Sequence, residues 1–283
     1  MPPTEGIHAT AIVDPRAGLG SRVRVGAYAV VGPEVTAADD VEIGHHAVLE
    51  GRVVLGAGVK IGAGAILGGV PQDLKFRPDT PSGVRVGAGT VVREYVVIHR
   101  ATTPEGWTEI GSQCLVMAMS HVAHDCRLGD GVVVINYAGI TGHCVIGDRA
   151  TVGGFSGMVP FTRVGIFAYI GGHARIVADI PPYMMVVGQP ATVRGVNVIG
   201  LRRAGMGAAE RRVLQDAHRL LYREGLSPRR AVERIRGELP PTPEVLTLLD
   251  FIAGARRGIC GPPGHDDEAG LALSASPRDA EEA

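Results

Sequence analysis

The chain has 283 residues and a formal net charge of −1, from 28 basic and 29 acidic residues. This balance argues against general nucleic-acid binding, which shows as a basic excess. Glycine occurs 41 times, while aromatic residues make up only 4% of the chain. Such a composition favours a narrow aliphatic core with many tight turns, since glycine adopts positive φ without penalty. It disfavours an ordinary α/β core.

The chain lacks the sequence features of secreted or membrane proteins. Its N-terminus shows no basic start followed by an apolar core, so no signal peptide is expected. No apolar run approaches the roughly 20 residues needed to cross a bilayer. No CxxC pair occurs among the cysteines, which are Cys114, Cys126, Cys144 and Cys260. We therefore expect reduced thiols in a cytoplasmic protein, without stable membrane insertion or a zinc knuckle.

An aliphatic residue recurs at every sixth position through three runs, which cover residues 7–67, 86–98 and 110–176. Of these 26 positions, 24 are Ile, Leu or Val, and glycine follows directly in 14. A period of six fits a short strand and a turn, with one inward side chain on each side of a three-sided coil of roughly 18 residues. The sequence therefore predicts an all-β solenoid, a left-handed parallel β-helix of hexapeptide repeats, over residues 1–190.

Two stretches depart from the repeat. Residues 68–85 break its phase and contain three prolines, which predicts a loop that projects from one coil. Residues 99–109 keep the phase, but Pro104 and a polar run predict a second, smaller loop. Loops on a rigid scaffold commonly carry binding groups.

The periodicity becomes helical past about residue 190. Helices are expected at about 208–223, 228–239 and 243–255, the last two with Ser-Pro and Thr-Pro starts. We assign residues 191–257 to a C-terminal helical domain. Residues 258–283 are small, polar and proline-rich, which predicts a disordered tail. The arginines of the helices form either solvated faces or a surface for an acidic partner.

The densest cluster of chemically competent side chains is His121, His124, Asp125 and His143. His124 and His143 lie about one coil apart, so both are expected to reach one cleft, with His99 not far off in phase. A neutral imidazole there suits general-base catalysis near pH 7, and Asp125 is placed to orient a ring.

Two other interpretations of the cluster stay open at this point. The histidines could lie on the surface of an inert solenoid. They could also bind zinc, as three histidines from adjacent coils and subunits do in γ-class carbonic anhydrases. The remaining sequence points away from a metal, so we expect neither a metal site nor a bound cofactor.

Four segments carry a family resemblance: GGVPQDLKF (68–76), VIHRAT (97–102), SHVAHDC (120–126) and GVNVIGLRR (195–203). From about residue 7 to 257, the chain resembles the UDP-N-acetylglucosamine O-acyltransferases of lipid A biosynthesis. The resemblance implies a homotrimer with active sites between adjacent β-helices. Its implied substrates are a UDP-sugar and a 3-hydroxyacyl chain carried by acyl carrier protein.

The resemblance also implies roles for individual residues. His124 matches the general base that deprotonates the sugar 3-hydroxyl or 3-amine, and Asp125 matches the residue beside that base. Gly142 matches the backbone N–H that stabilises the oxyanion. Further matches are expected to line the substrate: His121 and His143 at the sugar and phosphate, Asp73 and Lys75 at the nucleotide sugar, Asn197 and Arg203 at the nucleotide, and Gly172 at the base of the acyl groove.

Four positions depart from the family pattern. Val159 and Pro160 replace a His-Gln pair, while Ile199 and Ala204 replace a glutamate and a second arginine. These changes remove polar contacts around an intact His124-Asp125 pair. They keep two alternatives open: a hexapeptide acyltransferase with another nucleotide-sugar acceptor or acyl donor, and a sugar-nucleotide-binding paralogue without turnover.

Overall fold

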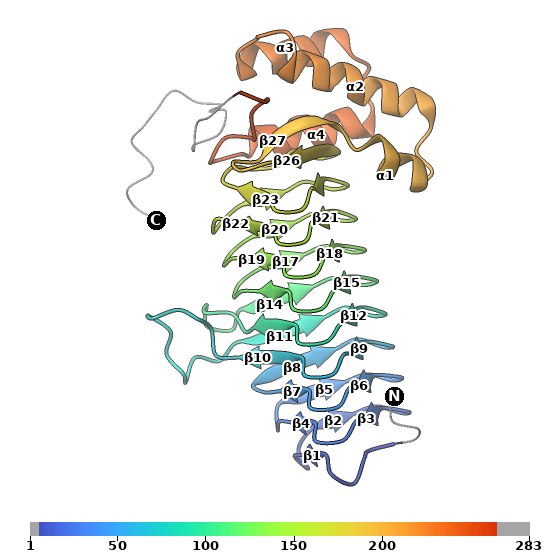
Figure 1. The fold of residues 1–283 in the computed structure, drawn as a ribbon, viewed down its shortest axis with the longest axis vertical. Coiled ribbons are helices and arrows are strands. Elements are labelled where there is room, and N and C mark those ends of the chain that lie inside the picture. The colour runs from blue at the N-terminus through green and yellow to red at the C-terminus, as the bar shows by residue number, and fades with distance from the viewer. Residues whose placement is uncertain (1–5, 265–283) are drawn as a thin grey trace.

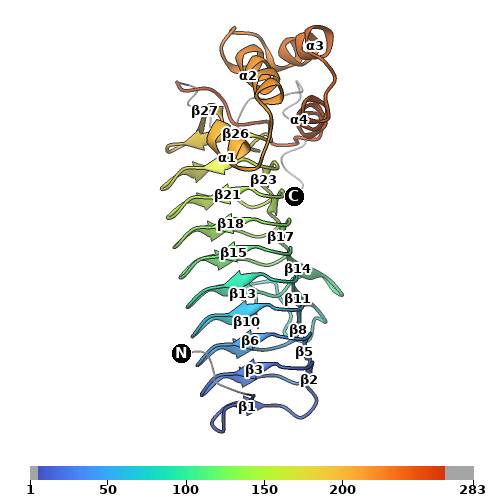
Figure 2. The same ribbon diagram turned by 90° about the vertical axis from the view of Figure 1, so that its right-hand side faces the viewer.

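The computed structural model describes residues 6–264, which form a tall stack of short β-strands closed at its C-terminal end by four α-helices (Figures 1 and 2). The chain turns through three sheets in each coil, and the fold is a left-handed parallel β-helix, as predicted. Among these residues, no helix is long and apolar enough to cross a membrane.

Each sheet collects one strand from successive coils. The nine-stranded sheet contains β1 (Ile12–Val13), β4 (Val30–Val31), β7 (Val48–Leu49), β10 (Ile66–Gly69), β13 (Val97–His99), β16 (His121–Val122), β19 (Gly139–Ile140), β22 (Gly157–Met158) and β25 (Arg175–Ile176). The eight-stranded sheet contains β2 (Gly18–Leu19), β5 (Val35–Ala37), β8 (Arg52–Leu55), β11 (Gly83–Val86), β14 (Trp107–Ile110), β17 (Arg127–Leu128), β20 (Val145–Ile146) and β23 (Arg163–Val164).

The third sheet has ten strands and ends the solenoid. It contains β3 (Arg24–Val25), β6 (Glu42–Ile43), β9 (Lys60–Ile61), β12 (Val91–Val92), β15 (Leu115–Val116), β18 (Val133–Val134), β21 (Thr151–Val152), β24 (Tyr169–Ile170), β26 (Met184–Val187) and β27 (Thr192–Val196). All its pairs are parallel except β26 with β27, which reverses the chain toward the helices.

The six-residue repeat forms the core. Apart from Ile7, Val13 and Leu19 in the first coil, every repeat position is buried. Strand pairing stacks like on like, so Val116 lies beside Val134 and Val134 beside Val152. Burying this aliphatic stack stabilises the fold at about 25 cal/mol per Å² of apolar surface.

Turns at the three edges of the coil use left-handed backbone, often without glycine. At the edge between the nine- and eight-stranded sheets, Asp125, His143 and Phe161 have φ of 57°, 62° and 64°. We call this the histidine edge. At the edge between the ten- and nine-stranded sheets, which we call the aromatic edge, the corresponding residues are Met119, Tyr137, Phe155 and His173. Non-glycine residues at positive φ are uncommon, so the coil imposes this conformation repeatedly.

Both predicted loops leave from the histidine edge. The projecting loop (residues 70–82) joins β10 to β11 and stands out from the stack in Figure 1. The threonine loop (residues 100–106) joins β13 to β14. Each is shorter than predicted, because β11 and β14 already pair within the predicted ranges, with Gly83 beside Trp107 and Val84 beside Thr108.

Four helices cover the last coil: α1 (Val198–Arg203), α2 (Ala208–Tyr222), α3 (Pro228–Glu238) and α4 (Pro243–Ala253). The last three match the predicted helices to within two residues, whereas α1 was not predicted. Ser227 and Thr242 cap α3 and α4 by accepting hydrogen bonds from backbone N–H groups, as their Ser-Pro and Thr-Pro sequences indicated.

The predicted disordered tail begins too early. Ile259 and Cys260 are buried, and the Cys260 N–H donates to the Asp179 carbonyl over 2.8 Å. Two apolar side chains keep this segment on the last coil, and the rest of the predicted tail, from residue 265, lies outside the described residues. Asp179 is itself buried, which raises the pKa of its carboxyl to about 6 against the opposing hydrogen bond and charge of Arg163.

Candidate active site

Successive turns of the histidine edge carry the predicted catalytic residues. His124 and Asp125 lie between β16 and β17, and Gly142 and His143 lie one coil later between β19 and β20. Because parallel strands stack about 4.8 Å apart, these turns are neighbours. The His124 and His143 rings meet edge to face, with centroids 5.1 Å apart, which confirms that the two histidines lie together.

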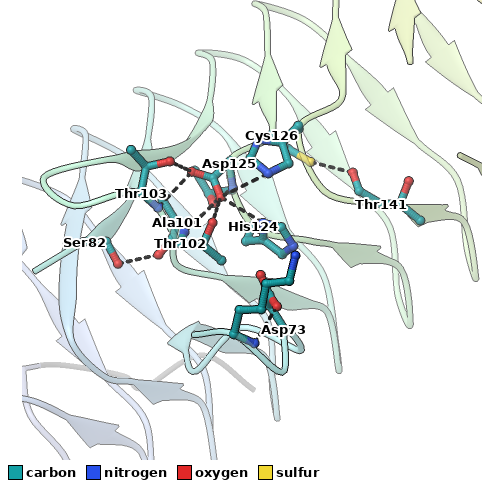
Figure 3. Close-up of polar contacts among 12 residues, drawn as sticks. Asp73, Ser82, Ala101, Thr102, Thr103, His124, Asp125, Cys126 and Thr141 are labelled. Carbon is teal, nitrogen blue, oxygen red and sulfur yellow. Dashed lines mark hydrogen bonds and ion pairs between the residues drawn. The ribbon is translucent and has the colours of Figure 1, made fainter. Parts of the chain in front are cut away.

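Asp125 joins the two histidines. His124 Nδ1 lies 2.8 Å from Asp125 Oδ2, and His143 Nε2 lies 3.9 Å from the same oxygen (Figure 3). The side chains of His124 and Asp125 are only 16% and 10% exposed. The pair therefore interacts in a setting that screens charge less than open water does.

The threonine loop surrounds the Asp125 carboxylate with donors. Thr102 donates to Oδ2 from its N–H (2.9 Å) and its hydroxyl (2.6 Å), and the Thr103 hydroxyl donates to Oδ1 (2.9 Å). Burial by itself raises the pKa of Asp125, but hydrogen bonds from Thr102, His124 and Thr103 outweigh it and lower the pKa to about 2. Asp125 is thus an anion over the physiological range.

An ionised Asp125 fixes the tautomer of its neighbour. A carboxylate only accepts hydrogen bonds, so the proton of neutral His124 resides on Nδ1 and donates to Oδ2. The Nε2 lone pair is then available to a substrate. This is the arrangement that a general base requires.

Gly142 lies directly against that imidazole. A Cβ added at Gly142 would stand 2.5 Å from His124 Cε1 and 2.7 Å from Nε2, so any side chain here would displace the ring. The Gly142 N–H donates no hydrogen bond to another residue of the range 6–264. His124 Nε2 therefore lies against a residue whose backbone donor is unused.

His121 contacts His99, which the sequence had placed near the cluster only by its phase in the repeat. His121 Nε2 lies 3.1 Å from His99 Nδ1, and the rings meet edge to face. Burial, reinforced by the neighbouring His121 and His124, lowers the pKa of His99 to about 4, and burial also lowers the pKa of His121. The pair is neutral at pH 7 and offers hydrogen bonds rather than charge.

The projecting loop brings Asp73 and Lys75 to the same edge of the solenoid. Asp73 Oδ1 accepts the Lys75 N–H over 2.8 Å, and Figure 3 draws Asp73 below His124. Arg100, directly after β13, fastens this loop: its guanidinium lies 5.3 Å from the Phe76 ring centroid and donates to the Pro78 carbonyl over 3.1 Å.

Three residues that were predicted to bind substrate lie away from His124 within one chain. Gly172 lies on the aromatic edge, where an added Cβ would stand 3.3 Å from the Gly154 carbonyl. Asn197 caps α1 by accepting the Gly200 N–H, and its amide donates to the Phe167 carbonyl. Arg203 is exposed in the last turn of α1.

The next turn of the histidine edge is apolar. Phe161 stacks on His143 with ring centroids 4.5 Å apart and planes 3° apart. Val159 and Pro160 precede it, in place of the polar pair expected from the family pattern. The side chains beyond His143 therefore offer packing rather than hydrogen bonds.

The cluster offers atoms for a metal but little free bonding capacity. One ligand atom each from His124, Asp125 and His143 lies within 4.8 Å of the others. Asp125 Oδ2 already accepts the Thr102 N–H, the Thr102 hydroxyl and the His124 Nδ1–H. A metal bound there would have to displace these donors, so the residues fit a hydrogen-bonded base better than a zinc centre.

Thr102, Thr103 and Phe161 were not identified from the sequence. A threonine pair in the polar run after His99 was the available signal for the first two. The phase of the repeat would have aligned Phe161 with His143, since both occupy the same turn position.

The hexapeptide-repeat solenoid, with a hydrogen-bonded histidine packed against Gly142, points to the acyltransferases built on such repeats. The family model described as UDP N-acetylglucosamine O-acyltransferase, domain 2, matches residues 179–260. A Trichlorobacter lovleyi acyl-[acyl-carrier-protein]–UDP-N-acetylglucosamine O-acyltransferase is 52% identical over 258 residues, which cover 90% of this chain and 98% of that protein. The chain belongs to this family of UDP-N-acetylglucosamine O-acyltransferases.

Solved structures agree over nearly the whole length. The Francisella novicida UDP-N-acetylglucosamine acyltransferase superposes with a TM-score of 0.88 at 31% identity, covering 91% of this chain and 95% of that one. The Bacteroides fragilis UDP-N-acetylglucosamine acyltransferase gives a TM-score of 0.86 at 33% identity, covering 89% and 98%. These matches include both the solenoid and the C-terminal helices.

Proposed function

We propose that this chain transfers a 3-hydroxyacyl group from acyl carrier protein to the 3-hydroxyl of UDP-N-acetylglucosamine, the first step of lipid A biosynthesis, in the cytoplasm. The observation that carries the proposal is the His124 ring, whose Nδ1 lies 2.8 Å from Asp125 Oδ2 and whose Nε2 lies against Gly142, where a Cβ would stand 2.7 Å away. The acyl chain arrives on the phosphopantetheine of its carrier as a co-substrate, and the chemistry needs no further cofactor.

The residues of the histidine edge account for each proton and bond. His124 Nε2 takes the proton of the sugar 3-hydroxyl as that oxygen attacks the thioester carbonyl. Asp125 stabilises the imidazolium that forms, and the Gly142 N–H donates to the oxyanion. When the C–S bond breaks, the imidazolium returns the proton to the departing thiolate, which leaves an O-acyl sugar and a free carrier thiol.

The acceptor is held by groups on both sides of the base. Lys75 and Asp73 approach from the projecting loop, and His121 and His143 flank His124 on the coils. The neutral His99–His121 pair suits hydroxyl groups and phosphate oxygens as a hydrogen-bonding surface. Arg203 is suited to a diphosphate, because its planar guanidinium donates in pairs.

A second copy of the chain would complete the site, and we propose a homotrimer. Gly172 lies on the aromatic edge, where Tyr137, Phe155 and His173 form one continuous stack. Tyr137 and Phe155 remain 50% and 57% exposed, and packing this edge against the histidine edge of a neighbour would bury them. A chain of 29.5 kDa should then elute with three times that mass in light scattering.

The acidic carrier is expected to dock near the helices. Residues 191–257 contain 13 arginines, no lysine and seven acidic residues. Some of these arginines are paired: Arg219 and Arg234, for example, bind Glu224. The excess positive charge would speed association with an acidic protein, and more so at low ionic strength.

A second candidate function is transfer to a different nucleotide sugar. It is favoured by the apolar turn of Val159, Pro160 and Phe161 beside His143, and by Ile199 and Ala204 near α1. The missing polar contacts would cost UDP-N-acetylglucosamine binding free energy. An acceptor with an apolar group at this turn, or with an amine at the 3-position, would lose less.

Direct transfer tests both candidates. Purified protein is incubated with 3-hydroxyacyl carrier proteins and a panel of UDP-sugars, and products are identified by mass spectrometry. Acylated UDP-N-acetylglucosamine is the expected product. A product from another sugar alone would favour the second candidate, and no product from any pair would leave a binding role without turnover.

A further inference from the structure

Two threonines of the threonine loop share the Asp125 carboxylate with His124. Thr102 places both of its donors on Oδ2, the oxygen that also accepts His124 Nδ1–H. The Thr103 hydroxyl binds the other oxygen, Oδ1. One carboxylate oxygen therefore divides its bonding capacity between Thr102 and the base (Figure 3).

The loop that carries these threonines is itself fixed on both sides. The Ser82 hydroxyl, buried at the end of the projecting loop, donates to the Ala101 carbonyl over 2.5 Å. The Glu105 N–H donates to the Pro81 carbonyl over 2.6 Å, and Arg52 pairs with the Glu105 carboxylate at 2.7 Å. Thr102 is thus held in place by residues of two neighbouring coils.

The Asp125 backbone is also fixed. Its N–H donates to the Thr108 hydroxyl over 2.9 Å, and Thr108 is fully buried in β14. With its main chain and side chain both held from the preceding coil, Asp125 has one geometry in which to meet His124.

We propose that Thr102 is a positioning residue that limits the basicity of His124 by sharing Asp125 Oδ2 with it. The inference rests on the proposed function of His124 as the base. Two Thr102 donors spread the negative charge of Oδ2, so the carboxylate stabilises the protonated imidazole less than it otherwise would. Without the Thr102 hydroxyl, that charge would concentrate on Oδ2 and the carboxylate would hold a protonated His124 ring more strongly.

Three further histidines surround His124. His143 meets it edge to face on the following coil, and His99 and His121 lie on the preceding coil and on its own coil. All three carry imidazole rings, and Asp125 supplies the carboxylate of the described metal-ligand-type cluster. Asp73 and Lys75 of the projecting loop are further charged residues at this edge. Replacing the Thr102 hydroxyl removes a hydrogen bond from Asp125 and none from the three histidines.

Thr102→Val removes the hydroxyl with little change in shape and keeps the N–H. We expect kcat to fall by about tenfold with KM within about twofold, and the acid limb of the kcat/KM profile to move to higher pH. Thr102→Ser, which restores the hydroxyl, should return both to wild type. Thr103→Val should have a smaller effect, because Oδ1 does not contact His124.

Thr90→Val serves as a matched control. Its buried hydroxyl donates to the Gly111 backbone carbonyl and accepts the Cys114 N–H, in a turn away from the histidine edge. We expect a loss of thermal stability with an unchanged pH profile. Circular dichroism and elution volume establish that each variant is folded.

A histidine-selective NMR titration separates this proposal from the proposed function, since it needs no substrate. In Thr102→Val, the His124 Cε1–H titration should move to higher pH in step with the acid limb. An unmoved titration, or a Thr102→Ser variant as impaired as Thr102→Val, would overturn the proposal. Absence of transfer in the wild type would contradict the proposed function while leaving the NMR comparison valid.

Discussion

At the scale of single residues, the site depends on one close approach and one shared anion. Gly142 leaves no room for a side chain next to His124, and Asp125 directs the ring through Nδ1. Neither feature uses an exceptional side chain. Asp125 belongs to the same turn as His124, whereas Gly142 is brought against the ring by the adjacent turn of the coil.

Removing the base gives the clearest residue-scale prediction. His124→Ala should lower the transfer rate by about 10²–10⁴, since that is the usual contribution of a positioned general base. Product formation is measured by mass spectrometry, and light scattering verifies an unchanged assembly. A rate equal to wild type would rule out the mechanism above.

Filling the space at Gly142 should be almost as damaging. In Gly142→Ala the new Cβ meets the His124 ring, so the proposed base moves away from the N–H proposed to bind the oxyanion. We expect a loss of about 10²–10³ in kcat. Gly139→Ala is the matched control, because a Cβ there meets nothing within 4 Å, and its rate should stay near wild type.

The apolar turn beside His143 predicts a change of preference. Val159→His restores a polar side chain at the position where the family pattern has one. If this departure sets the acceptor, kcat/KM with UDP-N-acetylglucosamine should rise by several-fold, the effect of about one regained hydrogen bond. Equal values would show that other residues compensate.

At the scale of elements, the repeat determined what could be predicted. Six-residue spacing identified the inward residues and placed His124 and His143 on adjacent coils. It could not place Thr102 against Asp125, because 23 residues separate them, whereas regular neighbours such as Asp130 and Asp148 are 18 apart. The threonine loop lengthens its coil without changing the six-residue phase, so Ile98 pairs with Val122. A contact made across this irregular loop leaves no periodic signal.

The projecting loop should become less ordered when the Arg100 side chain is removed. Arg100→Ala removes both the contact with Phe76 and the hydrogen bond to Pro78. The loop carrying Asp73 and Lys75 then becomes less ordered, so KM for the nucleotide sugar should rise by about tenfold while kcat falls less. Steady-state kinetics at saturating acyl donor measure this, and a change confined to kcat would contradict the role assigned to the loop.

At the scale of the whole molecule, a buried aspartate on the last coil of the solenoid holds the segment that follows the helices. Asp179 accepts the Arg163 N–H over 2.9 Å and anchors the segment of Cys260. Its pKa is about 6 in the folded chain against an ordinary 3.8. Folding therefore favours the protonated form, and the stability this group contributes is present below about pH 4 and lost as pH rises through 6.

Asp179→Asn removes that dependence, because the amide stays neutral. Wild type should lose about 3 kcal/mol of unfolding free energy between pH 4 and 8 from this group, a loss that the variant lacks. Urea denaturation at both pH values measures the difference. Parallel curves for the two proteins would show that Arg163 keeps Asp179 ionised throughout.

The stacking of the histidine edge has a consequence for how such an enzyme diversifies. Successive turns of this edge are about 4.8 Å apart, and Asp125, His143 and Phe161 occupy three successive turns. A substitution in one turn alters the side chain that a bound molecule contacts at that height, while the spacing of the coils stays the same. On the proposed function, the residues that select the acceptor and those that carry out the catalytic step lie in different turns and can change independently.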